Sequence, residues 1–189
     1  MKQLLIEIQE QFKKHASANT LASHQKFVPG LEKGYGVAMP VLNKMASTYK
    51  AGGFELVKTL WQGRYIEEKV LAAKLLGKIA KQDASQSLQL FEWMSASINN
   101  WAVCDALGMQ SLKPLVKTEV AAIFKLARKL NVADNLWQRR LSLVMVEWYT
   151  RDVHYHPQII QLVNALKNDE EYYVKKAIAW ILRNIEKGR

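Results

Sequence analysis

Apolar residues recur at helical spacing along nearly the whole chain. One face of a predicted N-terminal helix carries Leu4, Leu5, Ile8 and Phe12, and another face further on carries Val70, Leu71, Leu75 and Ile79. No segment alternates apolar and polar residues as a half-buried strand does. The pattern therefore predicts an all-α protein with about ten helices.

Residues that commonly cap helices give some of the predicted boundaries. Asn99 and Asn100 precede a short helix that Gly108 is expected to end, because glycine is common just beyond a helix C-terminus. A basic amphipathic helix is predicted over 115–130, and a further helix over 136–150.

The predicted helices repeat in pairs from residue 54 onward. When Ile66, Trp101, Trp137 and Tyr173 are set in register, the steps between them are 35, 36 and 36 residues. A fixed period of this size is typical of stacked helical hairpins, in which each hairpin buries its apolar face against its neighbours. The alternative is a set of unrelated helix pairs of similar length. We expect one domain over residues 1–189, an α-α superhelix of the HEAT or armadillo kind with a concave face.

The charge of the chain indicates an anionic partner. The 189 residues carry a formal net charge of +10, and residues 113–140 contain seven Lys or Arg against two acids. Such an excess is most often explained by nucleic acid, and less often by an acidic membrane surface. We therefore expect the concave face to be basic. The single cysteine, Cys104, excludes an intramolecular disulfide and suits a reducing compartment.

One residue breaks the pattern of the repeat. Four residues beyond each register point the chain has Val70, Asp105, Leu141 and Ala177. Three of these are apolar, as an inward-facing position should be. Burying a carboxylate at such a position costs roughly several kcal/mol unless it is paired or solvated. Asp105 is therefore a candidate functional residue. The alternative is a structural ion pair with Arg140 or with a lysine of a neighbouring repeat, and the two roles are compatible.

Tryptophan and arginine surround Asp105 in the repeat. Trp101 precedes Asp105 by one turn, and the equivalent helices carry Trp137 with Arg140 and Trp180 with Arg183. Aromatic rings, a carboxylate and arginines on one surface suit a cationic ligand beside a phosphate backbone. The chain has six tryptophans, and we interpret the other three, Trp61, Trp93 and Trp148, as packing residues.

Four segments together resemble the AlkD family of bacterial DNA alkylpurine glycosylases, which are built from HEAT-like repeats. The segment 100–105 (NWAVCD) is similar to the family's Trp-x-x-x-Asp signature, and the segment 35–40 (YGVAMP) to its Tyr-Gly-Val-x-x-Pro segment. The segments 135–140 (NLWQRR) and 173–183 (YVKKAIAWILR) are similar to the family's Leu-Trp-x-x-Arg and Lys-Ala-x-x-Trp-x-Leu-Arg segments. Their order and spacing match from about residue 27 to residue 184.

The resemblance implies a monofunctional glycosylase that hydrolyses the N-glycosidic bond of cationic alkylated purines, such as 3-methyladenine and 7-methylguanine, in duplex DNA. By position, Asp105 matches the catalytic carboxylate, Trp101 and Trp180 the aromatic pair near the sugar of the lesion, and Arg140 the arginine beside the phosphate. We also expect Trp137, Arg139 and Arg183 on the DNA-binding face. The family acts in base excision repair without flipping the damaged base into a pocket.

The chemistry of the lesion agrees with this set of residues. A cationic alkylpurine is already a good leaving group, so the reaction needs no general acid, metal or organic cofactor. The sugar becomes oxocarbenium-like as the bond breaks, and a nearby carboxylate stabilises that charge. A bacterial cytoplasmic, nucleoid-associated monomer that binds double-stranded DNA and no membrane is expected.

Two alternatives remain open. The chain ends six residues after Arg183, earlier than is usual in the family, so a shorter concave face with a weaker grip on DNA is expected. A DNA-binding protein without enzymatic activity is the first alternative, and a protein-binding solenoid is the second.

Overall fold

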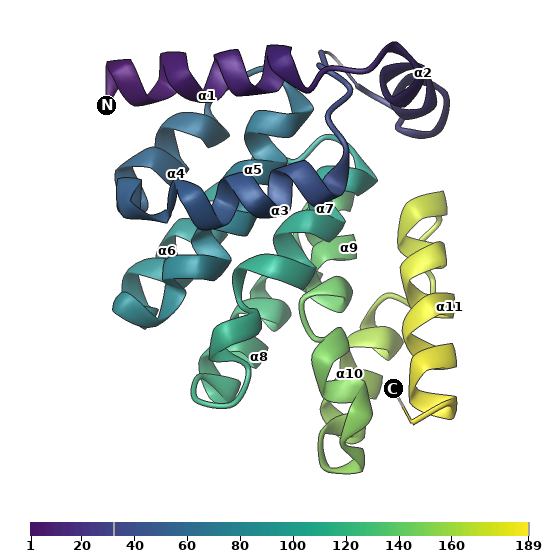
Figure 1. The fold of residues 1–189 in the computed structure, drawn as a ribbon. Coiled ribbons are helices and arrows are strands. Elements are labelled where there is room, and N and C mark those ends of the chain that lie inside the picture. Colours follow the sequence, from purple (N-terminus) through teal and green to yellow (C-terminus); the bar gives the residue numbers. More distant parts are fainter. Residues whose placement is uncertain (32, 189) are drawn as a thin grey trace.

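The computed structural model of the protein describes residues 1–31 and 33–188, and these fold into helices joined by short connections (Figure 1). The α-helices in chain order are α1 (Lys2–Lys14), α2 (Ala18–Phe27), α3 (Met39–Thr48), α4 (Gly53–Trp61), α5 (Ile66–Ile79), α6 (Ala84–Ser95), α7 (Trp101–Ala106), α8 (Val120–Asn131), α9 (Leu136–Val144), α10 (His156–Ala165) and α11 (Tyr172–Glu186). The described residues form no strand beyond one isolated bridge between Lys33 and Tyr65. The predicted all-α class is confirmed.

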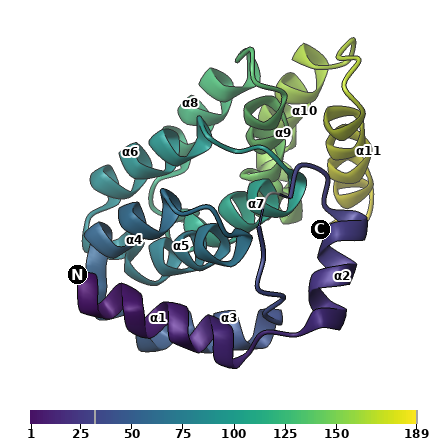
Figure 2. The same ribbon diagram turned by 90° about the horizontal axis from the view of Figure 1, so that it is seen from above.

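Two pairs of consecutive helices, α4–α5 and α8–α9, pack closely as helical hairpins. The second helices of successive hairpins, α5, α7, α9 and α11, pack on one another in chain order, and α3 packs on α5. The other row contains α4, α6, α8 and α10 (Figures 1 and 2). Stacked hairpins in two rows are the arrangement of an α-α superhelix, as the repeat predicted.

The register of the repeat corresponds to the beginnings of the helices in the inner row. Ile66 and Trp101 are the first residues of α5 and α7, and Trp137 and Tyr173 are the second residues of α9 and α11. One turn further on, Val70, Leu141 and Ala177 are at most 3% exposed. Asp105 occupies the equivalent place and is only partly buried.

The interpretation of the remaining tryptophans is right for one of them and wrong for another. Trp61 is 1% exposed and belongs to the core, whereas Trp93 is 45% exposed. Trp93 lies on the outward side of α6, where Lys58 and Gln89 line a surface cavity with it. Helical spacing could not separate the two sides, because the outer row also carries apolar residues that face solvent. Trp148 is half-buried.

The predicted end of the short helix at Gly108 is wrong. The helical chain continues from α7 through a π-helical turn, Leu107–Ser111, which contains Gly108. Glycine is needed here for packing, since a Cβ atom at this position would lie 2.6 Å from Cγ1 of Val144 in α9. Asp105 therefore does not lie at the C-terminal end of a helix, where the dipole would disfavour it.

Two predicted boundaries also differ from the structure. The helix predicted over 136–150 ends at Val144, and a separate 3-10 helix follows at Glu147–Arg151. The basic amphipathic helix predicted over 115–130 begins only at Val120, after a 3-10 turn at Lys113–Leu115. Apolar residues continue across both breaks, so the periodicity of the sequence did not reveal them.

Helix α2 is not predicted by the hydrophobic pattern, because it contains no buried residue and so has no apolar stripe. Its one local signal is Ser17, whose side chain accepts a hydrogen bond from the backbone of Thr20 and caps the helix. Within the described chain, we find no helix that combines the length and the apolar character needed to cross a bilayer.

Candidate active site

Asp105 and Arg140 form a two-pronged ion pair across the contact between α7 and α9. Nε of Arg140 donates to Oδ1 of Asp105 at 3.0 Å, and Nη2 donates to Oδ2 at 2.9 Å. Nη1 donates to the backbone carbonyl of Tyr173 in α11 at 2.8 Å. The guanidinium therefore joins three helices of the inner row and fixes the orientation of the carboxylate. The alternative that Asp105 has an ion-pair partner in Arg140 is confirmed.

The carboxylate is enclosed by protein and still reaches solvent. The side chain of Asp105 is 34% exposed and that of Arg140 is 10% exposed. Burial raises the pKa of Asp105 from its ordinary value of 3.8, while the hydrogen bonds and charge of Arg140 lower it in part. A carboxylate in these surroundings can act on a positive charge that arrives from the solvent side.

Trp101 separates two cavities next to this pair. The larger cavity, about 450 Å³, lies between α2 and α11 and is lined by Lys26, Phe27, Trp101, Arg140, Tyr172, Tyr173 and Lys176. These residues include three cations and no acid. Helices α2 and α11 lie near each other although they are far apart in the chain (Figure 2). The residues that line the cavity between them form a cationic, aromatic cleft. The indole Nε1 of Trp101 donates to the carbonyl of Phe27 at 2.8 Å and so links α7 to α2.

The second cavity, about 350 Å³, lies on the other side of Trp101 and contains Asp105. Its walls are mainly apolar and come from α2, α3, α5, α7 and the turn after α7, with Met39, Val70 and Met109 among them. Asp105 therefore lines the apolar cavity, while its partner Arg140 lines the cationic one, and the ion pair connects the two. The ion pair marks the place in the molecule where a ligand with both a cationic and an anionic part would fit.

Trp137 and Arg139 make contacts within the fold next to the site. The indole of Trp137 packs against the ring of Tyr173 at 5.0 Å between centroids, next to the carbonyl that Arg140 holds. Arg139 forms an ion pair with Asp169 and donates to the carbonyls of Ala133 and Asp134 at 3.0 and 2.7 Å. These hydrogen bonds are internal to the fold, and a contact of either residue with DNA stays a prediction.

Trp180 and Arg183 lie on α11, beyond the residues that line the cleft. Trp180 is partly buried against the core, and Arg183 is exposed. Neither residue lines the two cavities next to Trp101. The structure therefore brings together Trp101, Asp105 and Arg140, and leaves the roles of Trp180 and Arg183 as predictions.

A buried carboxylate that the sequence analysis missed positions the loop beside the site. Glu67 of α5 is 1% exposed and accepts hydrogen bonds from the backbone N–H groups of Tyr35, Gly36 and Val37 at 3.0, 2.8 and 3.2 Å. Three amide donors satisfy a carboxylate that would otherwise be costly to bury. Glu67 thus fixes the backbone of the Tyr-Gly-Val segment, and it also lines the cavity of Asp105.

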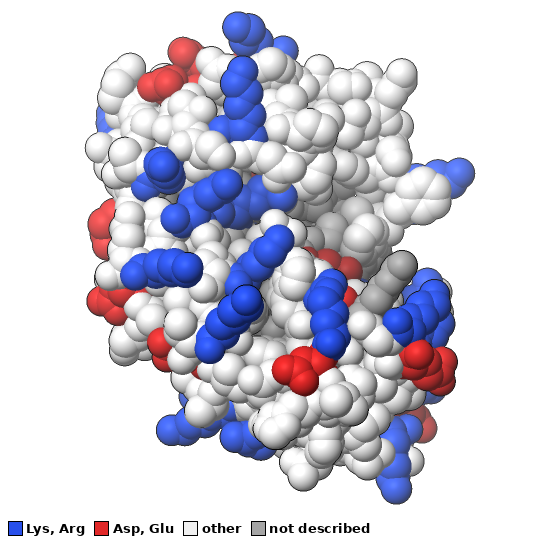
Figure 3. Space-filling model, turned by 60° about the horizontal axis from the view of Figure 1, so that its bottom comes forward, with Lys and Arg blue, Asp and Glu red and all other residues white. Residues whose placement is uncertain are grey.

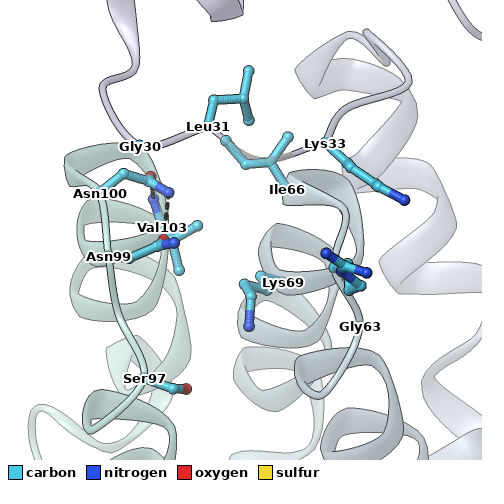
Figure 4. Close-up of a pocket in the computed structure, with 11 residues that line it drawn as sticks. Gly30, Leu31, Lys33, Gly63, Ile66, Lys69, Ser97, Asn99, Asn100 and Val103 are labelled. Carbon is cyan, nitrogen blue, oxygen red and sulfur yellow. Dashed lines mark hydrogen bonds between the residues drawn. The ribbon is translucent and has the colours of Figure 1, made fainter.

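A third cavity, about 130 Å³, lies between the beginnings of α5 and α7 (Figure 4). On its α7 side the Asn100 side chain accepts from the backbone N–H of Val103 at 3.0 Å and donates to Asn99 at 2.9 Å. The predicted cap at Asn100 is confirmed. It fixes the first turn of the helix that carries Trp101 and Asp105.

The sequence analysis also missed Phe27 and Tyr172 as residues of the cleft. Phe27 is 61% exposed and Tyr172 is 59% exposed, and each ring has a lysine over its face, Lys26 at 5.2 Å and Lys176 at 4.8 Å. These matching pairs face the cleft from opposite ends of the chain, so no local pattern could have revealed them. Lys and Arg side chains also cross the middle of the face drawn in Figure 3, and acidic side chains lie mostly towards its edges.

Among the described residues, no group of three or more His, Cys, Asp or Glu side chains is arranged to hold a metal ion. Cys104 is buried beside Asp105, and burial raises the pKa of its thiol well above the ordinary value. Such a thiol is protonated and a poor nucleophile.

A model of the family described as DNA alkylation repair enzyme matches residues 8–188, which is nearly the whole chain. No curated protein matches the chain significantly.

Proposed function

Because this chain belongs to the DNA alkylation repair enzyme family, we propose that it repairs duplex DNA as a glycosylase, by hydrolysing the N-glycosidic bond of cationic alkylated purines. The observation that carries the proposal is the Asp105–Arg140 pair, which holds a carboxylate at the edge of a cationic, aromatic cleft. 3-Methyladenine and 7-methylguanine are the expected substrates, because both carry a positive charge before the bond breaks.

Asp105 is the proposed catalytic carboxylate. As the glycosidic bond breaks, positive charge moves from the purine to the sugar, and an anion beside the sugar stabilises that charge. At a separation of about 4 Å and an effective dielectric constant of about 20, the interaction is worth up to about 4 kcal/mol. This corresponds to about a thousandfold in rate before the cost of desolvation is subtracted. Asp105 can also position the water that attacks the sugar.

Arg140 has two roles in this proposal. Three of the five N–H donors of its guanidinium are used by Asp105 and Tyr173, which leaves two for a phosphate oxygen in the cleft. The same side chain thus orients the carboxylate and holds the DNA backbone next to the lesion. Trp101 offers an aromatic face to the sugar cation, which is worth about 0.5 to 2 kcal/mol.

A DNA-binding protein without catalytic activity is the second candidate, favoured by the basic cleft itself. We expect incubation of the purified protein with methylated duplex DNA to yield free methylpurine and an equal amount of abasic sites, both quantified by mass spectrometry. If the protein binds this DNA and releases no base, the glycosylase proposal is wrong and the second candidate replaces it. If it does not bind DNA even at low salt, a protein-binding solenoid replaces both.

A further inference from the structure

A cavity that the proposed reaction does not use lies on the far side of the Asp105 cavity from the cleft. Its volume is about 210 Å³, and it is formed where α3, α5 and the turn after α7 meet. The residues lining it are Asn43, Ala46, Lys74, Gly77, Lys78, Gln110, Lys113 and Pro114. Three of these eight residues are lysines and none is an acid, so the cavity concentrates positive charge.

Lys74 is the most confined of the three lysines. It is 9% exposed, and its ammonium donates to the side-chain oxygen of Asn43 at 2.7 Å, a neutral partner. None of the ion pairs between described residues includes Lys74, Lys78 or Lys113. Burial, and then the charge of Lys78, lower the pKa of Lys74. A bound anion would relieve both effects, because it would replace lost hydration and offset the repulsion between like charges.

The ammonium of Lys113 contacts the indole ring of Trp148. The ammonium of Lys113 lies 4.4 Å from the centre of the indole ring, and Nε1 of that ring donates to the carbonyl of Met109 at 3.3 Å. Met109 belongs to the π-helical turn that follows Asp105 and also lines the Asp105 cavity. Trp148, which contacts Lys113, is therefore hydrogen-bonded to the turn that directly follows the helix of Asp105.

The lysine cavity is continuous with the surface that holds Asp105. Lys74 and Gln110 line both the lysine cavity and the apolar cavity of Asp105. Arg140 lies in the cleft on the opposite side of Trp101. Two cationic places thus flank the proposed catalytic carboxylate, and an extended polyanion could occupy both at once.

We propose that Lys74, Lys78 and Lys113 form a second phosphate site, which binds a phosphodiester group of the DNA some distance from the lesion. This inference rests on the proposed function for the identity of the polyanion. Contacts to two phosphate groups on either side of Asp105 fix the position of the strand, whereas a single contact at Arg140 leaves it free to pivot. The site recognises the backbone and carries no preference for sequence or lesion.

The salt dependence of binding to undamaged duplex DNA tests this site separately from catalysis. Each lost phosphate contact reduces the slope of log K against log salt by about 0.9. Because the three lysines share one phosphate group, we expect a reduction of about 0.9 in the triple variant Lys74→Met, Lys78→Gln, Lys113→Gln, and a smaller reduction in each single variant. The matched control is Lys58→Gln, since Lys58 lies on the outer row and pairs with Glu55 at 2.9 Å. We expect the control to keep the wild-type slope.

Thermal unfolding distinguishes loss of the site from loss of the fold. Lys74→Met removes a confined charge that has only a neutral partner, so we expect a midpoint equal to or above that of the wild type. Added inorganic phosphate should raise the midpoint of the wild type more than that of Lys74→Met, because a ligand stabilises only the form that binds it.

A wild-type slope in the triple variant, with normal binding and base release by the wild type, would overturn the second phosphate site alone. Failure of the wild type to bind duplex DNA would overturn the proposed function together with the site.

Discussion

Replacement of Arg140 by methionine separates the two roles of the ion pair. Methionine keeps the length and apolar stem of the side chain and removes both hydrogen bonds to Asp105 and the one to the carbonyl of Tyr173. Hydrogen bonds to charged groups contribute about 1.5 to 3 kcal/mol each when they are shielded. Asp105 is about one-third exposed, so we reduce the total loss to about 2 kcal/mol. For a chain of this length, the melting midpoint should then fall by about 4 to 8 °C.

The same variant should change the pH dependence of base release. Asp105 must be ionised to stabilise the sugar cation, so the rate falls as the pH drops through its pKa. In the wild type burial raises this pKa and Arg140 opposes the rise. Without Arg140 the opposing effect is lost, the pKa of Asp105 rises further, and the acidic limb of the profile moves to higher pH. Release of 7-methylguanine under single-turnover conditions, measured across the acidic range, reports the limb directly.

Arg139→Met is the matched control for this prediction. Arg139 is the next residue in the chain and forms an ion pair with Asp169 elsewhere. We expect a comparable loss of stability and an acidic limb that stays in place. If the limb of Arg140→Met coincides with that of the wild type, Arg140 does not set the ionisation of Asp105, and the reasoning from the ion pair is refuted.

Three further substitutions test the residues that position the site. Glu67→Gln leaves one oxygen for the N–H groups of Gly36 and Val37 and turns an amide donor towards the N–H group of Tyr35, so chemical denaturation should show a loss of about 1 to 3 kcal/mol. A loss below about 0.5 kcal/mol would contradict the role of Glu67. Gly36→Ala should lower the free energy of unfolding by more than about 2 kcal/mol in the same assay, because φ is +77° and a Cβ would lie 2.2 Å from the carbonyl of Ser17. Wild-type stability in this variant would show that the loop is not confined. Trp101→Phe loses the hydrogen bond to the carbonyl of Phe27, so it should lose about 1 kcal/mol of stability and keep most of its base release. Trp101→Ala should lose more stability and more base release. Equal rates of base release in the two variants would exclude the aromatic face from catalysis.

Much of the fold could be predicted from sequence because buried stripes and repeat period carry the same information. The register placed Trp101 and Trp137 at the beginnings of equivalent helices, and it identified Asp105 as the polar residue at an otherwise apolar position. The repeat also offered Arg140 as one of two possible ion-pair partners of Asp105, because Arg140 lies next to Leu141, the equivalent of Asp105 on the neighbouring inner helix.

The remaining features depend on contacts that a local pattern does not contain. Helix α2 packs no residue into the core, so the hydrophobic periodicity is silent there. Gly108 resembles a helix terminator in sequence, and only the approach of Val144 shows why glycine is present. Glu67 looks like an ordinary surface acid until the fold brings the backbone of Gly36 to it. The cleft joins Phe27 to Tyr172 across nearly the whole length of the chain, and no spacing rule reaches that far.

The most direct test of the central claim is the single-turnover rate of methylpurine release by Asp105→Asn beside the wild type. Asparagine preserves the size of the side chain and one acceptor for Arg140, and it removes the negative charge. From the Coulomb energy of a carboxylate beside the sugar cation, less the cost of desolvation, we predict a rate lower by about a hundredfold to a thousandfold. Unchanged binding of duplex DNA, and a melting midpoint well above the assay temperature, would show that the loss is chemical. A rate within about threefold of the wild type, which is less than 1 kcal/mol, would contradict the account and exclude Asp105 as the catalytic carboxylate.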